Sequence, residues 1–237
     1  MTESPHHLHP RLLLVEDDPI SRRFLQTSLQ TLPAHVDWAD SSTSALTLSR
    51  HHHHHLWLID LNLPDGGGTE LLSSLRRLHP NTPALAHTAE ANLQLPHDTG
   101  FLAVLPKPLS SKRLLEAVRH ALSNAPVEND PSPSISTYSD QNWDEAAGLA
   151  ALNGQHNHLD AMRKLFLAEL PKNCTAIETA LHHNDAQTLC AHLHRLQASC
   201  GFVGASRLSN ATRRLKENPN SKQARAHFHE AIKDLLH

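Results

Sequence analysis

The sequence predicts two folds in succession, an α/β domain built on a doubly wound five-stranded parallel sheet and then an all-α helical bundle. From residue 11 to 123, short apolar runs alternate with amphipathic stretches, as in a parallel sheet covered by helices. A stretch rich in Pro, Ser, Asn and Asp follows, and after it only helical spacing remains. We therefore expect a first domain at 8–123, a linker at 124–142 and a second domain at 143–237.

The expected strands of the first domain differ in their pattern. Four of them are apolar on both faces, as buried strands of a parallel sheet are, and lie at 11–16, 56–60, 83–88 and 101–106. A fifth, at 34–39, alternates between apolar and polar residues and suits the edge of the sheet.

Helical spacing between the strands predicts helices at 19–32, 42–50, 68–79 and 110–124. Ser110 is the expected N-cap of the last one. A further helix in 89–100 would be short or distorted, because Pro96 and Gly100 interrupt it.

The second domain contains a series of amphipathic stretches and no strand pattern, which predicts a bundle. These stretches lie at 144–152, 158–170, 172–183, 185–200, 205–217 and 221–236.

Composition narrows the functional classes. No apolar run approaches the roughly 18 residues that span a bilayer, so membrane insertion is not expected. A formal net charge of -3 argues against nucleic acid as a partner. Three cysteines without CxxC spacing, and an N-terminus without a secretory leader, favour the reducing cytoplasm. Of the 22 histidines, five form the run 51–55, to which we assign no role beyond linking a helix to a strand.

Chemically active side chains stand at the carboxyl ends of the expected strands. Glu16 and Asp17 end the first strand, Asp60 the third and Thr88 the fourth, while Lys107 follows the fifth. In an open parallel sheet these ends meet at one edge. Carboxylates that converge there require a cation, and an all-oxygen site suits Mg²⁺. Asp60 would then be a nucleophile for a phosphoryl group whose oxygens Lys107 and Thr88 contact.

The stretches LLLVEDDP, LWLIDLNLPDGGG, AHT and LPKP resemble, in order and placement, the signature stretches of response-regulator receiver domains, which have the flavodoxin-like fold. The resemblance implies that Glu16 and Asp17 hold the metal and that Asn62 offers it a backbone carbonyl. It implies that Asp60 is the phosphoacceptor, with Thr88 and Lys107 as its catalytic helpers. Gly68 stands in the loop after the acceptor, where the family has a glycine.

In the second domain, Leu189, Leu193, Leu196, Cys200 and Val203 recur at helical spacing and form one buried stripe. His194 lies off that stripe, on a side that also carries small residues such as Ala198. Small neighbours leave room for another protein to approach the imidazole closely.

The segment HRLQASCGFVGA resembles the motif of histidine-phosphotransfer (HPt) domains, in which an exposed histidine carries a phosphoryl group. The resemblance implies that His194 is the acceptor, with Arg195, Gln197 and Ala198 around it. Gln197 stands where the family has a lysine, so it can retain a hydrogen bond but not the charge; Arg195 can compensate in part.

These observations favour two-component phosphorelay signalling, in which Asp60 and His194 each carry a phosphoryl group. We expect the receiver to promote its own phosphorylation, without a separate catalytic output domain. The expected partners are a sensor histidine kinase, another receiver domain, or both. One alternative is a phosphorylation-controlled binding module whose helical domain docks a kinase or regulator without accepting phosphate. The others are a metal pair formed by Cys190 and His194 and a metal-storage or metal-sensing role for the histidines.

Overall fold

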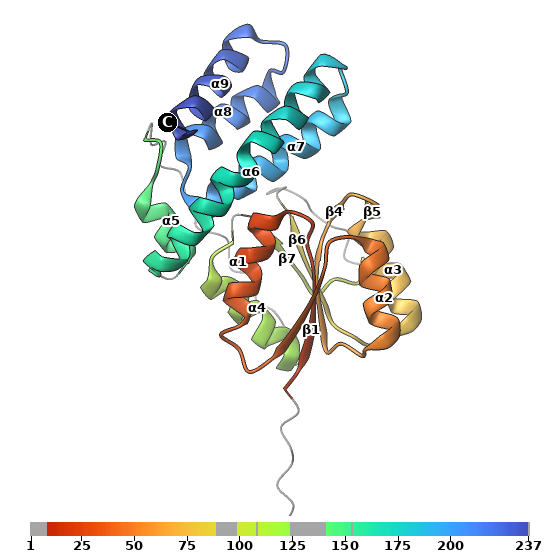
Figure 1. Ribbon diagram of the computed structural model, residues 1–237. Coiled ribbons are helices and arrows are strands. Elements are labelled where there is room, and N and C mark those ends of the chain that lie inside the picture. Colours follow the sequence, from red (N-terminus) through yellow and green to blue (C-terminus); the bar gives the residue numbers. More distant parts are fainter. Residues whose placement is uncertain (1–8, 89–98, 108, 124–140, 153, 237) are drawn as a thin grey trace, which may run out of the picture.

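The computed structural model describes residues 9–88, 99–107, 109–123, 141–152 and 154–236. Within them the chain forms an α/β domain with a helical bundle above the carboxyl ends of its strands (Figure 1). The helix expected in 89–100 falls almost wholly outside the described residues, as does the expected linker.

The sheet contains the five predicted strands, all parallel: β1 (Arg11–Val15), β2 (His35–Ala39), β3 (Leu56–Asp60), β6 (Ala84–Thr88) and β7 (Ala103–Pro106). Their order is β2-β1-β3-β6-β7, which is the flavodoxin-like order and confirms the predicted fold class. The alternating strand β2 lies at the edge, as its pattern predicts.

In the described part of the chain, helices cover both faces of the sheet (Figure 1). They are α1 (Pro19–Leu29) with α4 (Ser111–Ser123) on one face, and α2 (Ser42–His51) with α3 (Gly68–Leu78) on the other. Ser110 caps α4 as predicted, since its Oγ accepts a hydrogen bond from the Arg113 N–H at 3.3 Å. A small hairpin, β4 (Asn62–Leu63) with β5 (Gly66–Gly67), was not predicted, because strands of two residues have no periodicity to detect.

Part of the histidine run has a structural role. His51 ends α2, and His54, two residues before β3, is fully buried. The Nε2 atom of His54 lies 3.0 Å from Oδ2 of Asp37, a carboxylate that also accepts a hydrogen bond from Arg11. Burial lowers the pKa of His54, so this imidazole is neutral and serves the packing of the domain.

The second domain consists of α5 (Glu145–Ala151), α6 (His156–His182), α7 (Ala186–Val203), α8 (Ser206–Glu217) and α9 (Lys222–Leu236). The two stretches expected on either side of Pro171 form the single helix α6. Leu170 and Cys174 continue the same buried face across the proline, so packing keeps the helix continuous despite the missing N–H.

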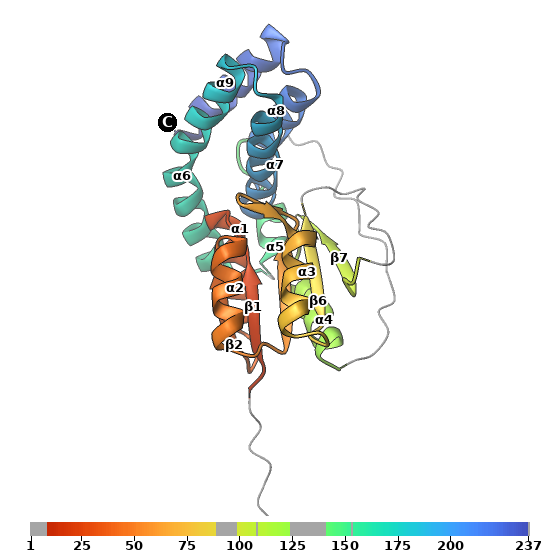
Figure 2. The same ribbon diagram turned by 90° about the vertical axis from the view of Figure 1, so that its right-hand side faces the viewer.

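The bundle packs directly on α1. The rings of Phe24 in α1 and Phe202 in α7 are stacked with centroids 4.4 Å apart, and both side chains are fully buried. Ser111 at the start of α4 donates a hydrogen bond to the Ala151 carbonyl at 3.2 Å. The apolar core on the α1 and α4 face of the sheet therefore continues into the bundle, whereas the core beneath α2 and α3 remains separate (Figures 1 and 2).

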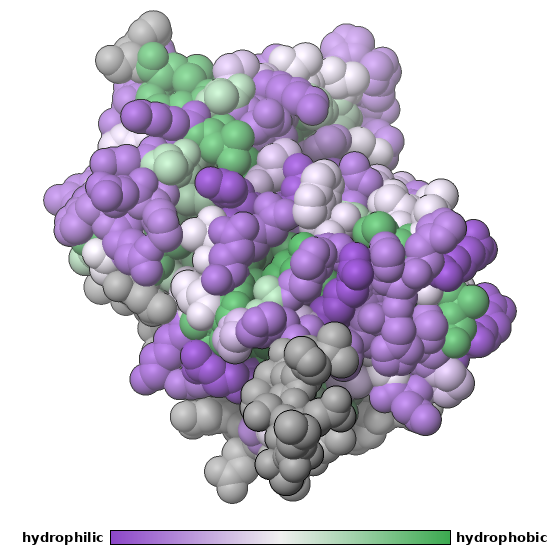
Figure 3. Space-filling view, turned by 60° about the horizontal axis from the view of Figure 1, so that its bottom comes forward, coloured by the Kyte–Doolittle hydropathy of each residue, from purple (hydrophilic) through white to green (hydrophobic). Residues whose placement is uncertain are grey.

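The opposite end of the sheet, where the strands begin, presents a mainly hydrophilic surface with small hydrophobic areas between (Figure 3). Nowhere in the described part of the chain is a helix both long and apolar enough to span a membrane.

Gly204 fixes the end of α7 against the start of α5. Its φ of 72° lies in the left-handed region, and its carbonyl accepts a hydrogen bond from the Asp144 N–H at 2.6 Å. A Cβ atom at this position would collide with the Asp144 carbonyl oxygen. Only glycine fits both the backbone angle and this close approach.

We expect Gly204→Ala to lower the free energy of unfolding by about 3 kcal/mol or more, since left-handed strain and a backbone collision add together. Gly154→Ala is the matched control: its φ is 77°, but nothing lies within 4 Å of an added Cβ. That variant should lose about 1 to 2 kcal/mol from backbone strain alone. Urea unfolding followed by circular dichroism measures both, and equal losses would contradict the role given to the Asp144 contact.

Candidate functional site

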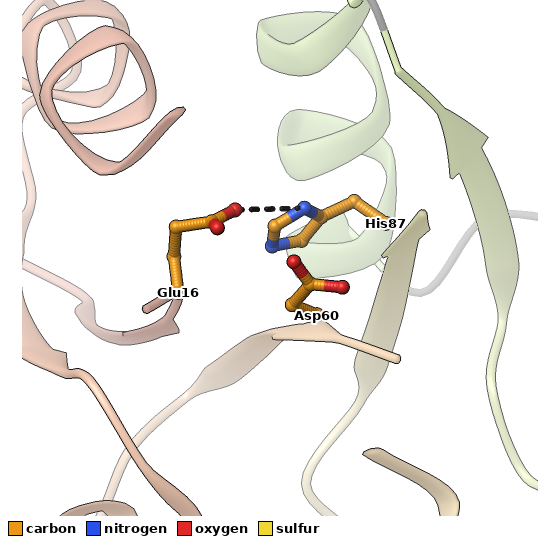
Figure 4. Close-up of side chains that lie close together, drawn as sticks. All are labelled: Glu16, Asp60 and His87. Carbon is orange, nitrogen blue, oxygen red and sulfur yellow. Dashed lines mark ion pairs between the residues drawn. The ribbon is translucent and has the colours of Figure 1, made fainter. Parts of the chain in front are cut away.

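Three side chains from neighbouring strands converge at the carboxyl edge of the sheet (Figure 4). Glu16 directly follows β1, Asp60 ends β3, and His87 comes from β6. One ligand atom from each lies within 4.8 Å of the others, and all three residues are buried. The predicted convergence of strand-end residues is therefore present for Glu16 and Asp60.

Lys107 joins the two carboxylates. Its Nζ lies 2.6 Å from Oε2 of Glu16 and 2.6 Å from Oδ2 of Asp60. The Lys107 N–H donates to the carbonyl of Thr88 at 2.7 Å, so the end of β6 positions the lysine backbone. The other oxygen of Asp60, Oδ1, accepts from the Asn62 N–H at 2.9 Å.

Burial and charge act in opposite directions on these groups. Burial alone would raise the pKa of Asp60, but the Lys107 ammonium and the Asn62 N–H lower it below its ordinary value. Burial would lower the pKa of Lys107, but Glu16 and Asp60 raise it. Burial raises the pKa of Glu16, and Lys107 opposes that effect. The site thus holds a charged lysine and an ionised Asp60.

His87 was not identified from the sequence. It lies in a strand that is apolar apart from this residue and the terminal Thr88, and a histidine within that strand was the available signal. Its Nδ1 is 3.4 Å from Oε2 of Glu16 (Figure 4). Burial, followed by the charge of Lys107, lowers the pKa of His87 to about 3, so the ring is neutral near pH 7.

Asp17 and Asp18 contact the second domain. Oδ2 of Asp17 lies 2.8 Å from a guanidinium nitrogen of Arg195. Oδ2 of Asp18 caps α1 by accepting a hydrogen bond from the Ser21 N–H. The same oxygen accepts a hydrogen bond from the Ser199 hydroxyl at 3.0 Å. Burial raises the pKa of Asp17 to about 6, although Arg195 opposes this. Asp18 thus takes part in capping α1 and in the contact between the domains.

The residues at this edge fit a hard divalent cation. Oδ1 of Asp17 is buried and has no hydrogen-bond partner among the described residues. Such an unsatisfied carboxylate oxygen is suited to bind a cation that prefers oxygen ligands. Among the described residues, one group of three side chains has metal-ligand spacing: Glu16, Asp60 and His87. Cys190 and His194, the alternative metal pair, belong to no such group in that part of the chain.

The loop after Asp60 also depends on a glycine. A Cβ atom on Gly68 would collide with the Asp60 carbonyl oxygen, and the Gly68 N–H donates to the carbonyl of Leu61 at 3.0 Å. The glycine therefore lets α3 begin directly against the backbone of Asp60.

Both predicted acceptors line one cavity. This cavity of about 560 Å³ lies between the domains, with Asp60 and Lys107 on one side and His194 and Arg195 on the other. Asn62, the first residue of β4, also lines it. Ala198, expected on an exposed side of α7, is 4% exposed and lines this cavity together with residues of the first domain. That burial could not be read from the helix alone.

The predicted surroundings of His194 are arranged differently from expectation. Arg195 contacts Asp17 rather than His194. Gln197 is half-buried and does not line the shared cavity as far as the described residues show. Lys216, which sequence reasoning did not identify, places its Nζ 3.2 Å from Nδ1 of His194.

Known proteins resemble both parts of the chain. The family model for the response regulator receiver domain matches residues 12–119, and that for the Hpt domain matches residues 161–237. Sensor protein GacS of Pseudomonas syringae pv. syringae is 26% identical over 238 residues, covering 95% of this chain. Sensor protein TorS of Escherichia coli (strain K12) is 27% identical over 215 residues, covering 89% of this chain.

The chain spans 26% of the length of GacS and 22% of that of TorS. Among solved structures, the signal receiver domain of an HD domain-containing protein from Pseudomonas fluorescens Pf-5 is 26% identical, with a TM-score of 0.49. That match covers 52% of this chain and 94% of the other.

We expect Lys107→Met to lower the free energy of unfolding by about 3 kcal/mol in metal-free buffer, since it leaves two buried carboxylates without their counter-charge. Without Lys107, burial would raise the pKa of Asp60 above its unfolded value, so the loss should grow as the pH rises from 5 to 8. Urea unfolding at both pH values with a chelator present measures this.

The control for Lys107→Met is Lys112→Met. Lys112 is exposed and its Nζ is 4.0 Å from Oε1 of Glu116, a contact that contributes at most about 0.5 kcal/mol. A loss for Lys107→Met that shrinks as the pH rises would show that the lysine does not compensate Asp60.

Proposed function

We propose that this chain, in which an Hpt domain follows a response regulator receiver domain, works in two-component phosphorelay signalling. In this proposal one phosphoryl group is exchanged between Asp60 and His194 of the same molecule. The observation that carries the proposal is the cavity shared by these two side chains. Both acceptors face the same cavity between the domains, and direct transfer requires that the two side chains share one space.

In the first step, a carboxylate oxygen of Asp60 attacks the phosphorus of a donor. The new P–O bond forms as the bond to the leaving group breaks, and the leaving group keeps that electron pair. Lys107, whose ammonium already contacts Asp60, and the hydroxyl of Thr88 would take the charge that develops on the phosphoryl oxygens. Glu16, Asp17, Asp60 and the Asn62 carbonyl would hold Mg²⁺, which neutralises charge on a bound phosphoryl group.

In the second step, a ring nitrogen of His194 attacks the same phosphorus. The N–P bond forms, the O–P bond breaks, and its electron pair returns to the Asp60 carboxylate. The proton on the other ring nitrogen passes to water. Ala198 is small and would let α7 approach the receiver closely, while Arg195 holds the two domains together through Asp17.

We also propose domain boundaries at 8–123 and 143–237, with a linker between them, and a sensor histidine kinase or a further receiver as the external partner. The two domains themselves carry out the transfers in this proposal. A cytoplasmic location is supported by Cys174, Cys190 and Cys200, which are all free thiols.

The alternative, a binding module whose helical domain does not accept phosphate, rests on the neutral Gln197. It predicts phosphate on Asp60 and none on His194. An aspartyl phosphate is lost in alkali and a phosphohistidine in acid, so the two acceptors can be separated chemically.

Incubation of wild type with Mg²⁺ and acetyl phosphate should place phosphate on Asp60 and then on His194. We expect Asp60→Asn to carry phosphate at neither position, and His194→Gln to carry it on Asp60 alone. Transfer within one chain should proceed at a rate independent of protein concentration. Phosphopeptide mass spectrometry with acid and alkali treatment measures each position.

The test of transfer within one chain is a mixture. Equimolar His194→Gln and Asp60→Asn chains can transfer phosphate only between molecules, so labelling of His194 should be slow and should rise with concentration. Labelling in the mixture as fast as in wild type would overturn the same-chain proposal. A wild type labelled on Asp60 but never on His194 would favour the binding module.

We further expect Arg195→Ala to slow the transfer from Asp60 to His194 about fivefold, since a partly exposed ion pair between domains contributes up to about 1 kcal/mol. Labelling of Asp60 by acetyl phosphate should persist, because Asp17 remains in place to hold Mg²⁺. Arg214→Ala, on the exposed side of α8, is the matched control. An Arg195→Ala chain that transfers at the wild-type rate would show that the ion pair with Asp17 does not support docking.

A further inference from the structure

The two acceptors differ in how their charge is balanced within their own domains. Asp60 contacts the ammonium of Lys107 directly. One turn beyond His194, the family's lysine is replaced by Gln197, which carries no charge. A phosphoryl group adds close to two negative charges near neutral pH, and charge-assisted hydrogen bonds are the strong ones available to hold it. A cation from another part of the bundle would meet that need.

The neighbouring helix α8 provides such a cation. Nζ of Lys216 lies 3.2 Å from Nδ1 of His194. An ammonium has only donors, so the lysine donates and Nδ1 accepts. The adjacent Leu215 and, two turns earlier, Leu208 are fully buried and anchor α8 in the bundle core. Packing of α8 therefore brings the lysine to the imidazole, although the two residues are 22 positions apart.

We infer that Lys216 is a positioning residue that stabilises phosphorylated His194, by donating to Nδ1 and by supplying the positive charge that Gln197 lacks. This inference rests on the proposed function. It differs from the family resemblance, which led us to expect compensation from Arg195; that side chain contacts Asp17 instead.

The chemistry of the ring explains what this contact would do. With Lys216 at Nδ1, the N–P bond is assigned to Nε2. Attack by the Nε2 lone pair requires the tautomer with its proton on Nδ1, so the lysine releases Nδ1 for that step. Once the N–P bond has formed and the O–P bond has broken, the Nδ1 proton passes to water, and Nδ1 again accepts from Lys216.

Loss of the phosphoryl group follows the reverse proton movement. A proton on Nδ1 makes the imidazole a better leaving group, so the N–P bond breaks more readily when water attacks the phosphorus. An ammonium that donates to Nδ1 competes with that proton and repels it. Lys216 should therefore lengthen the lifetime of phosphohistidine and move its acid-catalysed loss to lower pH.

The experiment uses the full chain with Asp60→Asn, so that the phosphoryl group cannot return to the receiver. Phosphoramidate, a small donor that phosphorylates histidine, labels the protein, and mass spectrometry follows phosphate on His194 between pH 5 and 9. With Lys216→Met we expect decay about tenfold faster at pH 7, in line with a lost hydrogen bond from a charged donor. The rise in decay rate should begin at a higher pH than in the parent chain.

Lys216→Arg keeps a cationic donor and should retain most of the lifetime, while Lys172→Met, at an exposed position of α6, should change nothing. Lys216→Gln is a second variant that keeps the side chain polar, and it should also decay faster. A lifetime and a pH profile unchanged in both Lys216→Met and Lys216→Gln would overturn this inference alone. Absence of phosphate on His194 in the parent chain would instead overturn the proposed function, and the inference with it.

Discussion

The packing of α7 against α1 is the interaction on which the arrangement of the whole chain depends. The stacked rings of Phe24 and Phe202 extend the apolar core of one face of the sheet into the bundle. Because the strands of a parallel sheet end on the same side, a helix held across their ends can face residues that follow several strands, and α7 faces a cavity lined by Asp60 and Lys107. Burial of two aromatic rings, rather than the few polar contacts between domains, therefore brings His194 to the cavity that Asp60 lines.

Polar contacts around this apolar anchor link domain docking to the acidic site. Asp17 pairs with Arg195 from the bundle, although one of its oxygens remains buried without a partner among the described residues. Asp18 caps α1 and accepts from Ser199. Asp17 and Asp18 thus both contact the bundle, and Asp18 also caps a helix of its own domain. A cation held by Asp17 would neutralise the carboxylate that Arg195 pairs with, so in the proposed function metal binding and domain docking are electrostatically connected.

The sequence was sufficient for local features and insufficient for contacts between domains. Strand-end residues such as Asp60 could be identified because a fully apolar run that stops at an acid has one reading in a parallel sheet. The continuous helix through Pro171 could not, since a proline normally ends a helix and only tertiary packing overrides it. Ser199 bonds to an acid 181 positions away, and no periodic pattern records such a pairing. His87 and Lys216 were not identified for the same reason, because the residues they contact, Glu16 and His194, lie on other elements.

The charges at the two acceptors suggest how the direction of transfer could be set. Lys107 contacts two carboxylates and stabilises Asp60 as an ionised group, which is its form after it has given up a phosphoryl group. Lys216 contacts the Nδ1 atom that must be unprotonated when His194 carries the group. In the proposed mechanism Lys107 also contacts the oxygens of a phosphoryl group on Asp60, so it serves both sides of the exchange. Lys216 is therefore the lysine that would favour one side, the ionised aspartate with the phosphorylated histidine. A metal ion that withdraws Asp17 from Arg195 would act on the opposite side, because it stabilises the phosphoryl group at the receiver.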